Sequence, residues 1–336
     1  MKKMFIRGTG RYLPERVVTN DDLTKFMDTS DEWIQQRTGI EERRWVAEEG
    51  NIGSSDLALE ASRIALNRAG WKPEDLDLII FATLSPDLFF PGSGCLLQSK
   101  LGLKSTPAID IRQQCTGFLY GMEIADAYIK SGYASRILLV GAEVHSTGLE
   151  MTTRGRDVTV IFGDGAGAVC LEGVETDENV GVLATSLHAQ GDYAEALMTE
   201  APASRNNPRI CKEDFDEGRH FPTMDGKNVF KLAVRRLPEV TNTVLQKAGL
   251  TLDDIDMIFP HQANLRINQF YQKAMDLPDE KMYNNIQKYG NTTAATIPIS
   301  IDEALEKNLI SDKKSTIVLS GLGAGVTWGA IIFRFG

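Results

Sequence analysis

Cys115 is the residue whose type and position most directly suggest covalent chemistry. It follows AIDI (108–111), which reads as a short buried strand, and it precedes apolar residues that keep helical spacing up to Gly132. A thiol at the beginning of a helix faces the positive end of the helix dipole, which favours the thiolate and lowers the thiol pKa. The position therefore predicts a nucleophile. The alternative, a small buried hydrophobe, is our interpretation of the other cysteines, Cys95, Cys170 and Cys211.

Two polar residues nearer the C-terminus could assist such a nucleophile. His261 ends a predicted strand in IFPHQANLRI (258–267), and Asn291 lies just ahead of a predicted helix in KYGNTTAATIPISIDEAL (288–305). A nucleophilic thiol needs partners that activate it, and these two residues are the candidates. Their separation along the chain means that the fold must bring them to Cys115.

The elements that carry these residues belong to an internal repeat. ALNRAGWKPEDLDLIIFATL (65–84) aligns with VLQKAGLTLDDIDMIFPHQA (244–263) at an offset of 179. SRILLVGAE (135–143) aligns with STIVLSGLG (315–323) at an offset of 180. Two matches at nearly one offset indicate a duplicated half.

Each half alternates helices with strands that are apolar throughout. The first matched helix ends at Gly70 in one half and at Gly249 in the other, each in the position of a left-handed cap. This alternation predicts an α/β fold with helices on both faces of its sheets. We place the halves at residues 1–174 and 175–336, dividing the chain at the polar stretch ETDEN, and expect them to pack as one unit.

The repeat also relates the three candidate residues. At an offset of 180, Cys115 falls opposite Ala295, and Asn291 lies one turn before that position. Two halves related by a pseudo-twofold axis would bring these two junctions toward each other at the interface between the halves.

Six motifs, in order along the chain, resemble those of one family. They are TSDEWIQQRTGI (29–40), QCTGF (114–118), IFGDGAGA (161–168), HQANLRI (261–267), YGNTTAA (289–295) and GLGAGVTWGAIIFRF (321–335). From end to end the chain resembles β-ketoacyl-acyl carrier protein synthase III, a thiolase-fold condensing enzyme. This resemblance implies a five-layered αβαβα sandwich built from a duplicated half, in agreement with the repeat.

The resemblance implies a decarboxylative Claisen condensation that initiates fatty acid synthesis. Cys115 would take an acyl group from an acyl-CoA primer, and malonyl-acyl carrier protein would then lose CO2. His261, as a neutral imidazole, and the Asn291 amide would stabilise the enolate, and the backbone N–H groups of Cys115 and Ala324 would hold the acyl oxyanion. Relatives can carry Gly where this chain has Ala324, so a left-handed backbone there would be strained, but a backbone contact should survive.

The resemblance also assigns residues that would bind coenzyme A, which is a substrate carrier here and not a permanent cofactor. They are Thr29, Trp33, Arg37, Arg156 and Asn264. Trp33 and Arg37, on a short helix opened by Thr29 or Ser30, would flank the adenine, with Arg156 on its other side. The alternative is a surface helix with one buried Trp.

Two further groups follow from the same resemblance. The acyl pocket would include Phe90, Leu197 and Phe230, and acyl carrier protein would dock on Lys231, Arg266 and Lys273. Phe90 would reach across a homodimer interface into the neighbouring acyl pocket, although a plain core role is an alternative. Because the carrier protein is acidic, a basic patch suits it.

Residue counts separate this family from its rivals. Elongating condensing enzymes use Cys-His-His, but no histidine follows His261, and degradative thiolases need a late cysteine, but none follows Cys211. Papain-like proteases share the order Cys, His, Asn but surround their cysteine with CGSCW. The alternatives left open are a family member of secondary metabolism with a nonstandard acyl donor or acceptor, a thiol hydrolase, and a noncatalytic scaffold.

Both glycine-rich runs, GDGAGA (163–168) and GLGAG (321–325), superficially resemble nucleotide-binding loops. Neither opens a helix, since the residues that follow each run read as strands, and no GK[ST] follows. We therefore expect tight turns with close backbone packing.

Composition limits the other functions. The 336 residues carry a net charge of -10, which disfavours nucleic acid and anionic lipid, and no apolar run is long enough for a membrane helix. The scattered cysteines suggest neither disulfides nor zinc, and we expect a cytoplasmic protein without metal. His145, His188 and His220 match no catalytic motif and read as structural or surface residues.

The segment between His188 and Met224 is about ten residues longer than we expect from the family. The polar composition of Ala194 to Pro222 predicts a surface loop. The primer could therefore be acetyl, branched or a longer acyl group.

Overall fold

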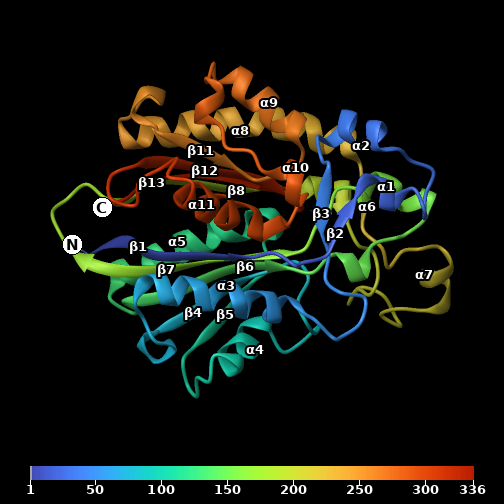
Figure 1. Ribbon diagram of the computed structural model, residues 1–336, viewed down its shortest axis with the longest axis horizontal. Helices are drawn as coiled ribbons and strands as arrows, with labels where there is room; N and C mark the ends of the chain where they lie inside the picture. Colours follow the sequence, from blue (N-terminus) through green and yellow to red (C-terminus); the bar gives the residue numbers. More distant parts are fainter. Residues whose placement is uncertain (1) are drawn as a thin grey trace.

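Two β-sheets lie one above the other with helices between them and outside them (Figure 1). The computed structural model describes residues 2–336. In the first outer layer are α3 (Ser54–Ala69) and α4 (Ser93–Lys100), in the central layer α5 (Gly117–Ser131) and α11 (Thr296–Glu306), and in the second outer layer α8 (Gly226–Ala248) and α9 (Leu265–Ala274). The expected five-layered αβαβα sandwich is confirmed.

The first sheet contains five strands in the order β1-β7-β6-β4-β5. They are β1 (Lys2–Tyr12), β7 (Gly165–Glu175), β6 (Arg136–Glu143), β4 (Leu78–Ala82) and β5 (Ala108–Ile111). Strand β4 runs parallel to β5 and β6, whereas β7 runs antiparallel to β1 and β6. The strand predicted at 108–111 is therefore confirmed.

The second sheet contains four strands in the order β11-β12-β13-β8. They are β11 (Met257–Pro260), β12 (Thr316–Gly323), β13 (Thr327–Arg334) and β8 (Gly181–Ala189). Only β11 and β12 are parallel. A single parallel bridge from Ile258 to Met282 stands beside β11 where the first sheet has its β4–β5 pair, so the repeat has lost most of one strand.

The junctions that precede α5 and α11 follow the same backbone path. The 3-10 turn η2 (Gln114–Thr116) leads into α5, and η8 (Thr293–Ala295) leads into α11. Gln114 has a φ of 46° and Thr293 a φ of 48°, in the left-handed region that L-residues rarely adopt. The matching offset here is 179, so Cys115 corresponds to Ala294. Our expectation of Ala295, from an offset of 180, is wrong by one residue because the insertion between the matches lies farther along.

The halves share one hydrophobic core. The strands of the first sheet lie between Lys2 and Glu175, and those of the second between Gly181 and Arg334. The central cluster nevertheless draws on both parts, with Met4, Phe118, Phe259 and Phe333 among its members. This shared burial explains why the halves pack as one unit; the division at 174/175 itself stays a prediction.

Two sets of glycines bring backbones close together. A Cβ on Gly167 would lie 2.7 Å from the Ile299 nitrogen, and one on Gly323 would lie 2.8 Å from the Cys115 Cβ. Close packing is thus confirmed for both runs. The expectation of turns is wrong in part, since Gly165 and Gly167 lie within β7 and Gly321 and Gly323 within β12.

An N-terminal arm covers one end of the sandwich (Figure 1). It comprises β2 (Val17–Thr19), α1 (Asn20–Leu23), α2 (Asp31–Thr38) and β3 (Glu42–Arg44). Arg43 is completely buried, and its guanidinium donates to the Val18 carbonyl, the Asn20 Oδ1 and the Val160 carbonyl. These bonds tie the arm to the end of α6 (Arg156–Thr159).

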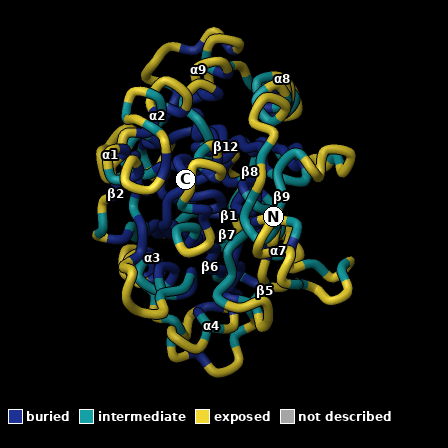
Figure 2. The backbone as a smooth tube through the Cα atoms, turned by 90° about the vertical axis from the view of Figure 1, so that its right-hand side faces the viewer, coloured by how far each residue is buried: buried dark blue, intermediate teal, exposed yellow. Residues whose placement is uncertain are grey.

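The long segment is more ordered than the predicted surface loop. Its ends pair as β9 (Leu197–Met198) and β10 (Thr223–Met224), and it contains α7 (Lys212–Asp216). Ala201 and Asp214 are buried, although most of the segment is exposed and projects from the body of the protein (Figure 2). Composition missed this because three isolated buried residues in a polar stretch, Ala201, Asp214 and Gly218, leave no periodic pattern. Within residues 2–336, no helix has the length and apolarity needed to cross a membrane.

Candidate active site

Cys115 lies where two cavities meet. A small cavity of about 110 Å³ is lined by Cys115, His261 and Asn291 together with mostly apolar side chains. A larger cavity of about 650 Å³ also reaches Cys115 and extends under the long segment. The fold therefore brings together the three residues that the sequence predicted. His261 and Asn291 follow Cys115 in the chain by at least 146 positions.

The expected lowering of the Cys115 pKa is wrong. Burial raises the pKa of the thiol to about 12, and the Glu143 carboxylate adds to the effect. The backbone N–H groups of Cys115 and Ala324 act in the opposite direction but do not compensate. Desolvation of a charge in an apolar site outweighs the half charge of a helix end, so the resting side chain is a thiol.

The same two N–H groups support the predicted oxyanion site. Both lower the thiol pKa by hydrogen bonding, so both point toward the sulfur and could hold a negative oxygen formed beside it. The strain we expected at Ala324 is absent, because the positive φ of 126° falls on Gly325 instead. The bare Gly323 allows β12 to pass close to Cys115.

His261 follows β11 directly and is buried as a neutral ring. Its Nδ1 lies 2.7 Å from the Thr296 hydroxyl oxygen, and its Nε2 is buried without a hydrogen-bond partner among residues 2–336. Burial lowers the pKa of this imidazole to about 3. An unpartnered ring nitrogen that borders the small cavity is available to a substrate.

Asn291 is held through its amide oxygen, and its NH2 group donates to no residue within 2–336. Its Oδ1 accepts a hydrogen bond of 2.8 Å from the Thr293 N–H, and its own backbone N–H donates to the Ile161 carbonyl at 2.9 Å. Since the amide oxygen is occupied, the Nδ2 hydrogens are the part of the group that can face a ligand. The site thus offers two uncharged groups beside a thiol.

The residues expected to bind coenzyme A lie on the arm and on α6 and α9. The guanidinium carbons of Arg37 and Arg156 lie 4.2 Å and 4.3 Å from the centre of the Trp33 ring. An adenine stacked on Trp33 would replace one of these contacts. Ser30, and not Thr29, caps α2, while the Thr29 hydroxyl is buried without a partner within residues 2–336.

Asn264 and two of the three expected acyl-pocket residues border the cavities, whereas Phe90 lines neither. Asn264 lines the small cavity, but its side chain already caps α9 and donates to the Arg37 carbonyl. Phe230 lines the small cavity, and Leu197 lines both. Phe90 is 78% exposed, which rules out the core role that we kept as its alternative.

The basic residues expected to dock a carrier protein project from the outer helices. Lys231 on α8 and Arg266 and Lys273 on α9 are all exposed. Within residues 2–336, none of the three belongs to an ion pair. The Arg266 guanidinium lies 5.6 Å from the centre of the Phe230 ring, so the patch adjoins the mouth of the small cavity.

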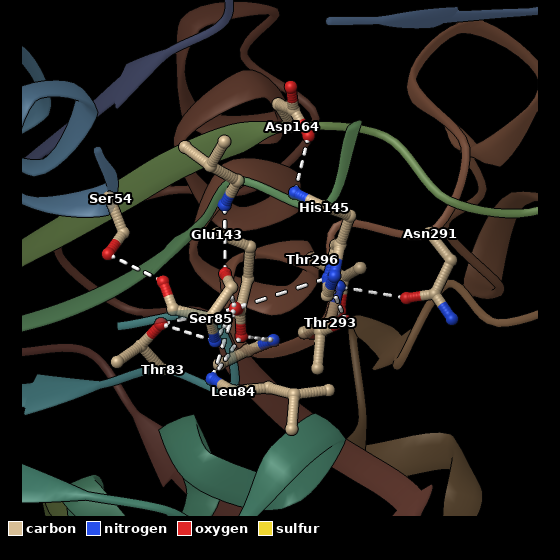
Figure 3. Close-up of polar contacts among 12 residues, drawn as sticks. Ser54, Thr83, Leu84, Ser85, Glu143, His145, Asp164, Asn291, Thr293 and Thr296 are labelled. Carbon is tan, nitrogen blue, oxygen red and sulfur yellow. Dashed lines mark hydrogen bonds and ion pairs between the residues drawn. The ribbon is translucent and has the colours of Figure 1, made fainter. Parts of the chain in front are cut away.

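Sequence reasoning missed a polar network behind the site (Figure 3). It comprises Glu143, His145, Thr293 and Thr296, with Leu84, Ser85 and Thr83 around the carboxylate. We interpreted His145 only as a structural or surface residue. The available signal was a glutamate and a histidine two positions apart at the end of a buried strand.

Comparisons with known proteins give the family. Residues 109–191 match the family described as 3-Oxoacyl-[acyl-carrier-protein (ACP)] synthase III, and residues 245–335 match its C-terminal part. A β-ketoacyl-[acyl-carrier-protein] synthase III of Fusobacterium nucleatum is 43% identical over 100% of this chain and 99% of its own. The chain belongs to the β-ketoacyl-[acyl-carrier-protein] synthase III family.

Similar solved structures agree with this family assignment. The enzyme of Aquifex aeolicus superimposes with a TM-score of 0.88 at 41% identity and full coverage of both chains. A priming β-ketosynthase from the R1128 polyketide pathway superimposes with a TM-score of 0.88 at 26% identity, over 99% of this chain and 96% of its own. The synthase III assignment makes this chain an acyl-transferring condensing enzyme with the thiolase fold.

Proposed function

We propose that this protein condenses an acyl-CoA primer with malonyl-acyl carrier protein, the step that initiates fatty acid synthesis, through an acyl-Cys115 intermediate. The observation that carries the proposal is the small cavity, in which one buried thiol faces a neutral imidazole and a free amide NH2. A thioester can be attacked there, and an enolate can be held there, without a charged side chain. Family membership supports the same reaction.

The first half-reaction would use the thiol and the two backbone N–H groups. The Cys115 sulfur attacks the acyl carbonyl carbon, and the oxyanion lies against the N–H groups of Cys115 and Ala324. The bond from that carbon to the CoA sulfur then breaks. Because the thiol pKa is about 12, the thiol proton must leave as the bond forms, and the departing CoA sulfur takes it up and leaves as a thiol.

The second half-reaction would use His261 and Asn291. The malonyl C–C bond breaks, CO2 leaves, and the electron pair becomes an enolate whose oxygen accepts from Asn291 Nδ2 and His261 Nε2–H. The enolate carbon then attacks the acyl carbon, the bond from that carbon to the Cys115 sulfur breaks, and the released thiolate takes up a proton from solvent to return to the resting thiol. A neutral ring with its proton on Nε2 accepts a hydrogen bond at Nδ1, so in that state the Thr296 hydroxyl would donate to Nδ1 instead of to the Thr293 carbonyl.

Mass spectrometry of the protein after incubation with a panel of acyl-CoA thioesters tests the proposal. We expect an adduct on Cys115 that is discharged as a β-ketoacyl product when malonyl-acyl carrier protein is added. Adduct discharge by water, without malonyl thioester, would instead favour a thiol hydrolase. An unmodified Cys115 with every acyl-CoA would contradict the proposal.

A synthase of secondary metabolism is the second candidate. The observations that favour it are the large cavity under the long segment and the likeness to a polyketide priming enzyme. The chain-length preference of the Cys115 adduct separates the two candidates. A preference for acetyl or short branched primers favours fatty acid initiation, whereas a preference for long or unusual acyl groups favours the second.

We also propose that the protein works as a cytoplasmic homodimer without a permanent cofactor. The exposed apolar run Leu88, Phe89 and Phe90 supports pairing, because water-exposed side chains of this size favour a partner surface. Coenzyme A would be bound at Thr29, Trp33, Arg37, Arg156 and Asn264, and the carrier protein would dock on Lys231, Arg266 and Lys273. Sedimentation at several protein concentrations tests the assembly.

A further inference from the structure

His145 belongs to the polar network behind the active site (Figure 3), and it also lines the larger cavity. It follows β6, and its ring packs against Phe162 with the two ring centres 4.7 Å apart. Phe162 in turn lines both cavities. The side chain is 9% exposed, so its polar atoms are confined to few partners.

The principal partner of His145 is Thr293. The His145 Nε2 lies 2.6 Å from the Thr293 hydroxyl oxygen. The Glu143 carboxylate lies 4.0 Å from the same nitrogen, and it also accepts a hydrogen bond of 3.3 Å from the Ala294 N–H. The end of β6 and the residues after it therefore contact the η8 turn at two consecutive residues, Thr293 and Ala294.

Thr293 in turn holds both residues assigned to the enolate. Its N–H donates to the Asn291 Oδ1 at 2.8 Å, and its carbonyl accepts from the Thr296 hydroxyl at 3.0 Å. That hydroxyl is the partner of His261 Nδ1. One residue with a left-handed backbone thus fixes the orientation of the amide directly and that of the imidazole through one hydroxyl.

We infer that His145 is a positioning residue for the decarboxylation half-reaction, acting through Thr293 on Asn291 and His261. Cys115 lies on the other junction and has no hydrogen bond to this network within residues 2–336. The sulfur and its two N–H groups would therefore keep their geometry when the His145–Thr293 bond is lost. The inference rests on the proposed function.

Four variants test the inference. His145→Leu removes the bond to Thr293, and His145→Gln keeps a polar group near the Nε2 position. Thr293→Val replaces the hydroxyl by a methyl group of similar shape, and Thr293→Ser keeps the hydroxyl. His188→Leu is a control at a histidine that stacks on Trp328 and lines neither cavity.

The two half-reactions are measured separately, as decarboxylation of malonyl thioester and as acylation of Cys115 by acyl-CoA. We expect His145→Leu and Thr293→Val to lower kcat for decarboxylation by about 10- to 100-fold, as removal of an orienting outer partner does elsewhere. KM for malonyl thioester and the acylation rate should stay within about threefold of the parent. His145→Gln and Thr293→Ser should recover most of the lost rate, and His188→Leu should match the parent.

Equal losses in both half-reactions would show a merely structural role and overturn the inference. Unchanged decarboxylation in His145→Leu and Thr293→Val would overturn it as well. If His145→Leu does not fold, the Thr293 pair decides alone, because Thr293→Val preserves the packing. If the parent itself neither forms the adduct nor decarboxylates, the proposed function fails and the inference falls with it.

Discussion

The two strand-to-helix junctions of the repeat have the same backbone conformation but present different chemical groups. In the first, the left-handed Gln114 precedes Cys115 and presents a thiol to both cavities. In the second, the left-handed Thr293 precedes Ala294, whose side chain offers no chemistry, and the hydrogen bonds of the turn orient Asn291 and His261 instead. Duplication therefore supplied one geometry twice, and in the proposed mechanism substitution divided the two half-reactions between the copies.

The largest test of this division is the loss of the thiol. Cys115→Ala should abolish acylation and condensation, because no other nucleophile is assigned to the site, and we expect a fall of at least about 1,000-fold. Decarboxylation of malonyl thioester should stay measurable. Adduct formation and CO2 release are the two measurements.

The reciprocal variants should show the opposite pattern. His261→Ala or Asn291→Ala should lower decarboxylation by about 100- to 1,000-fold, the usual effect of one lost oxyanion donor. Their acylation rates should fall far less. If these variants decarboxylate like the parent while Cys115→Ala does not, the division between the junctions is wrong.

A smaller effect on acylation is expected when a methyl group is added beside Cys115 at the first junction. Gly323→Ala would place a Cβ 2.8 Å from the Cys115 Cβ and 3.0 Å from its nitrogen. Such overpacking typically costs about 1 to 3 kcal/mol, so we expect a lower melting temperature and acylation slowed by about 10- to 100-fold. Gly191→Ala, whose Cβ would meet no atom within 4 Å and which lines neither cavity, is the matched control. Parent-like acylation in Gly323→Ala would mean that the thiol is less confined than we infer.

Charge reversal at the basic patch should affect only the half-reaction that uses the carrier protein. Arg266→Glu or Lys231→Glu should raise the KM for malonyl-acyl carrier protein by about three- to tenfold and leave acylation from acyl-CoA unchanged. The effect should weaken as salt rises, because exposed charges are screened over about 8 Å at physiological ionic strength. Arg235→Glu, at a residue that pairs with Glu239 on the same helix, is the control. An equal rise of this KM in Arg235→Glu would mean that Lys231 and Arg266 do not form a specific docking patch.

The smallest expected effect is that of pH on the rate of decarboxylation, the half-reaction assigned to the second junction. The pKa of His261 is lowered to about 3, so the ring is neutral above that pH and decarboxylation by Cys115→Ala should vary less than about threefold between pH 5.5 and 8.5. A histidine with the ordinary pKa of about 6.5 would lose roughly tenfold of its neutral form at pH 5.5. Burial raises the pKa of Glu143 to about 7. A step in the rate near pH 7 would therefore assign control to Glu143 instead.

Local signals in the sequence predicted much of this fold. The strand at 108–111, the left-handed caps at Gly70 and Gly249, the end of a helix at Gly132 and the position of His261 at the end of a strand are all confirmed. These features depend on residue type and short-range periodicity, which a single sequence displays. The internal repeat allowed the layered architecture to be predicted as well, because two similar halves must each bury the apolar faces of their sheets and helices.

Features that depend on three-dimensional surroundings were missed or wrong. The Cys115 pKa is set by desolvation, which depends on what surrounds the sulfur and not on its place before a helix. The left-handed Gln114 and Thr293 carry side chains that give no signal of such a backbone. His145 gains its partner 148 positions away, so no spacing rule could link it to Thr293.

Arg43 makes the arm that carries Trp33 dependent on a distant part of the chain. All three of its acceptors are buried with it, and one of them, the Val160 carbonyl, follows α6 with its Arg156. Trp33, on one side of the expected adenine site, and Arg156, on the other side, therefore both depend on the hydrogen bonds of the Arg43 guanidinium. Amide hydrogens of β2, β3 and the residues around Val160 should consequently exchange with solvent as a single cooperative unit, with one shared opening free energy.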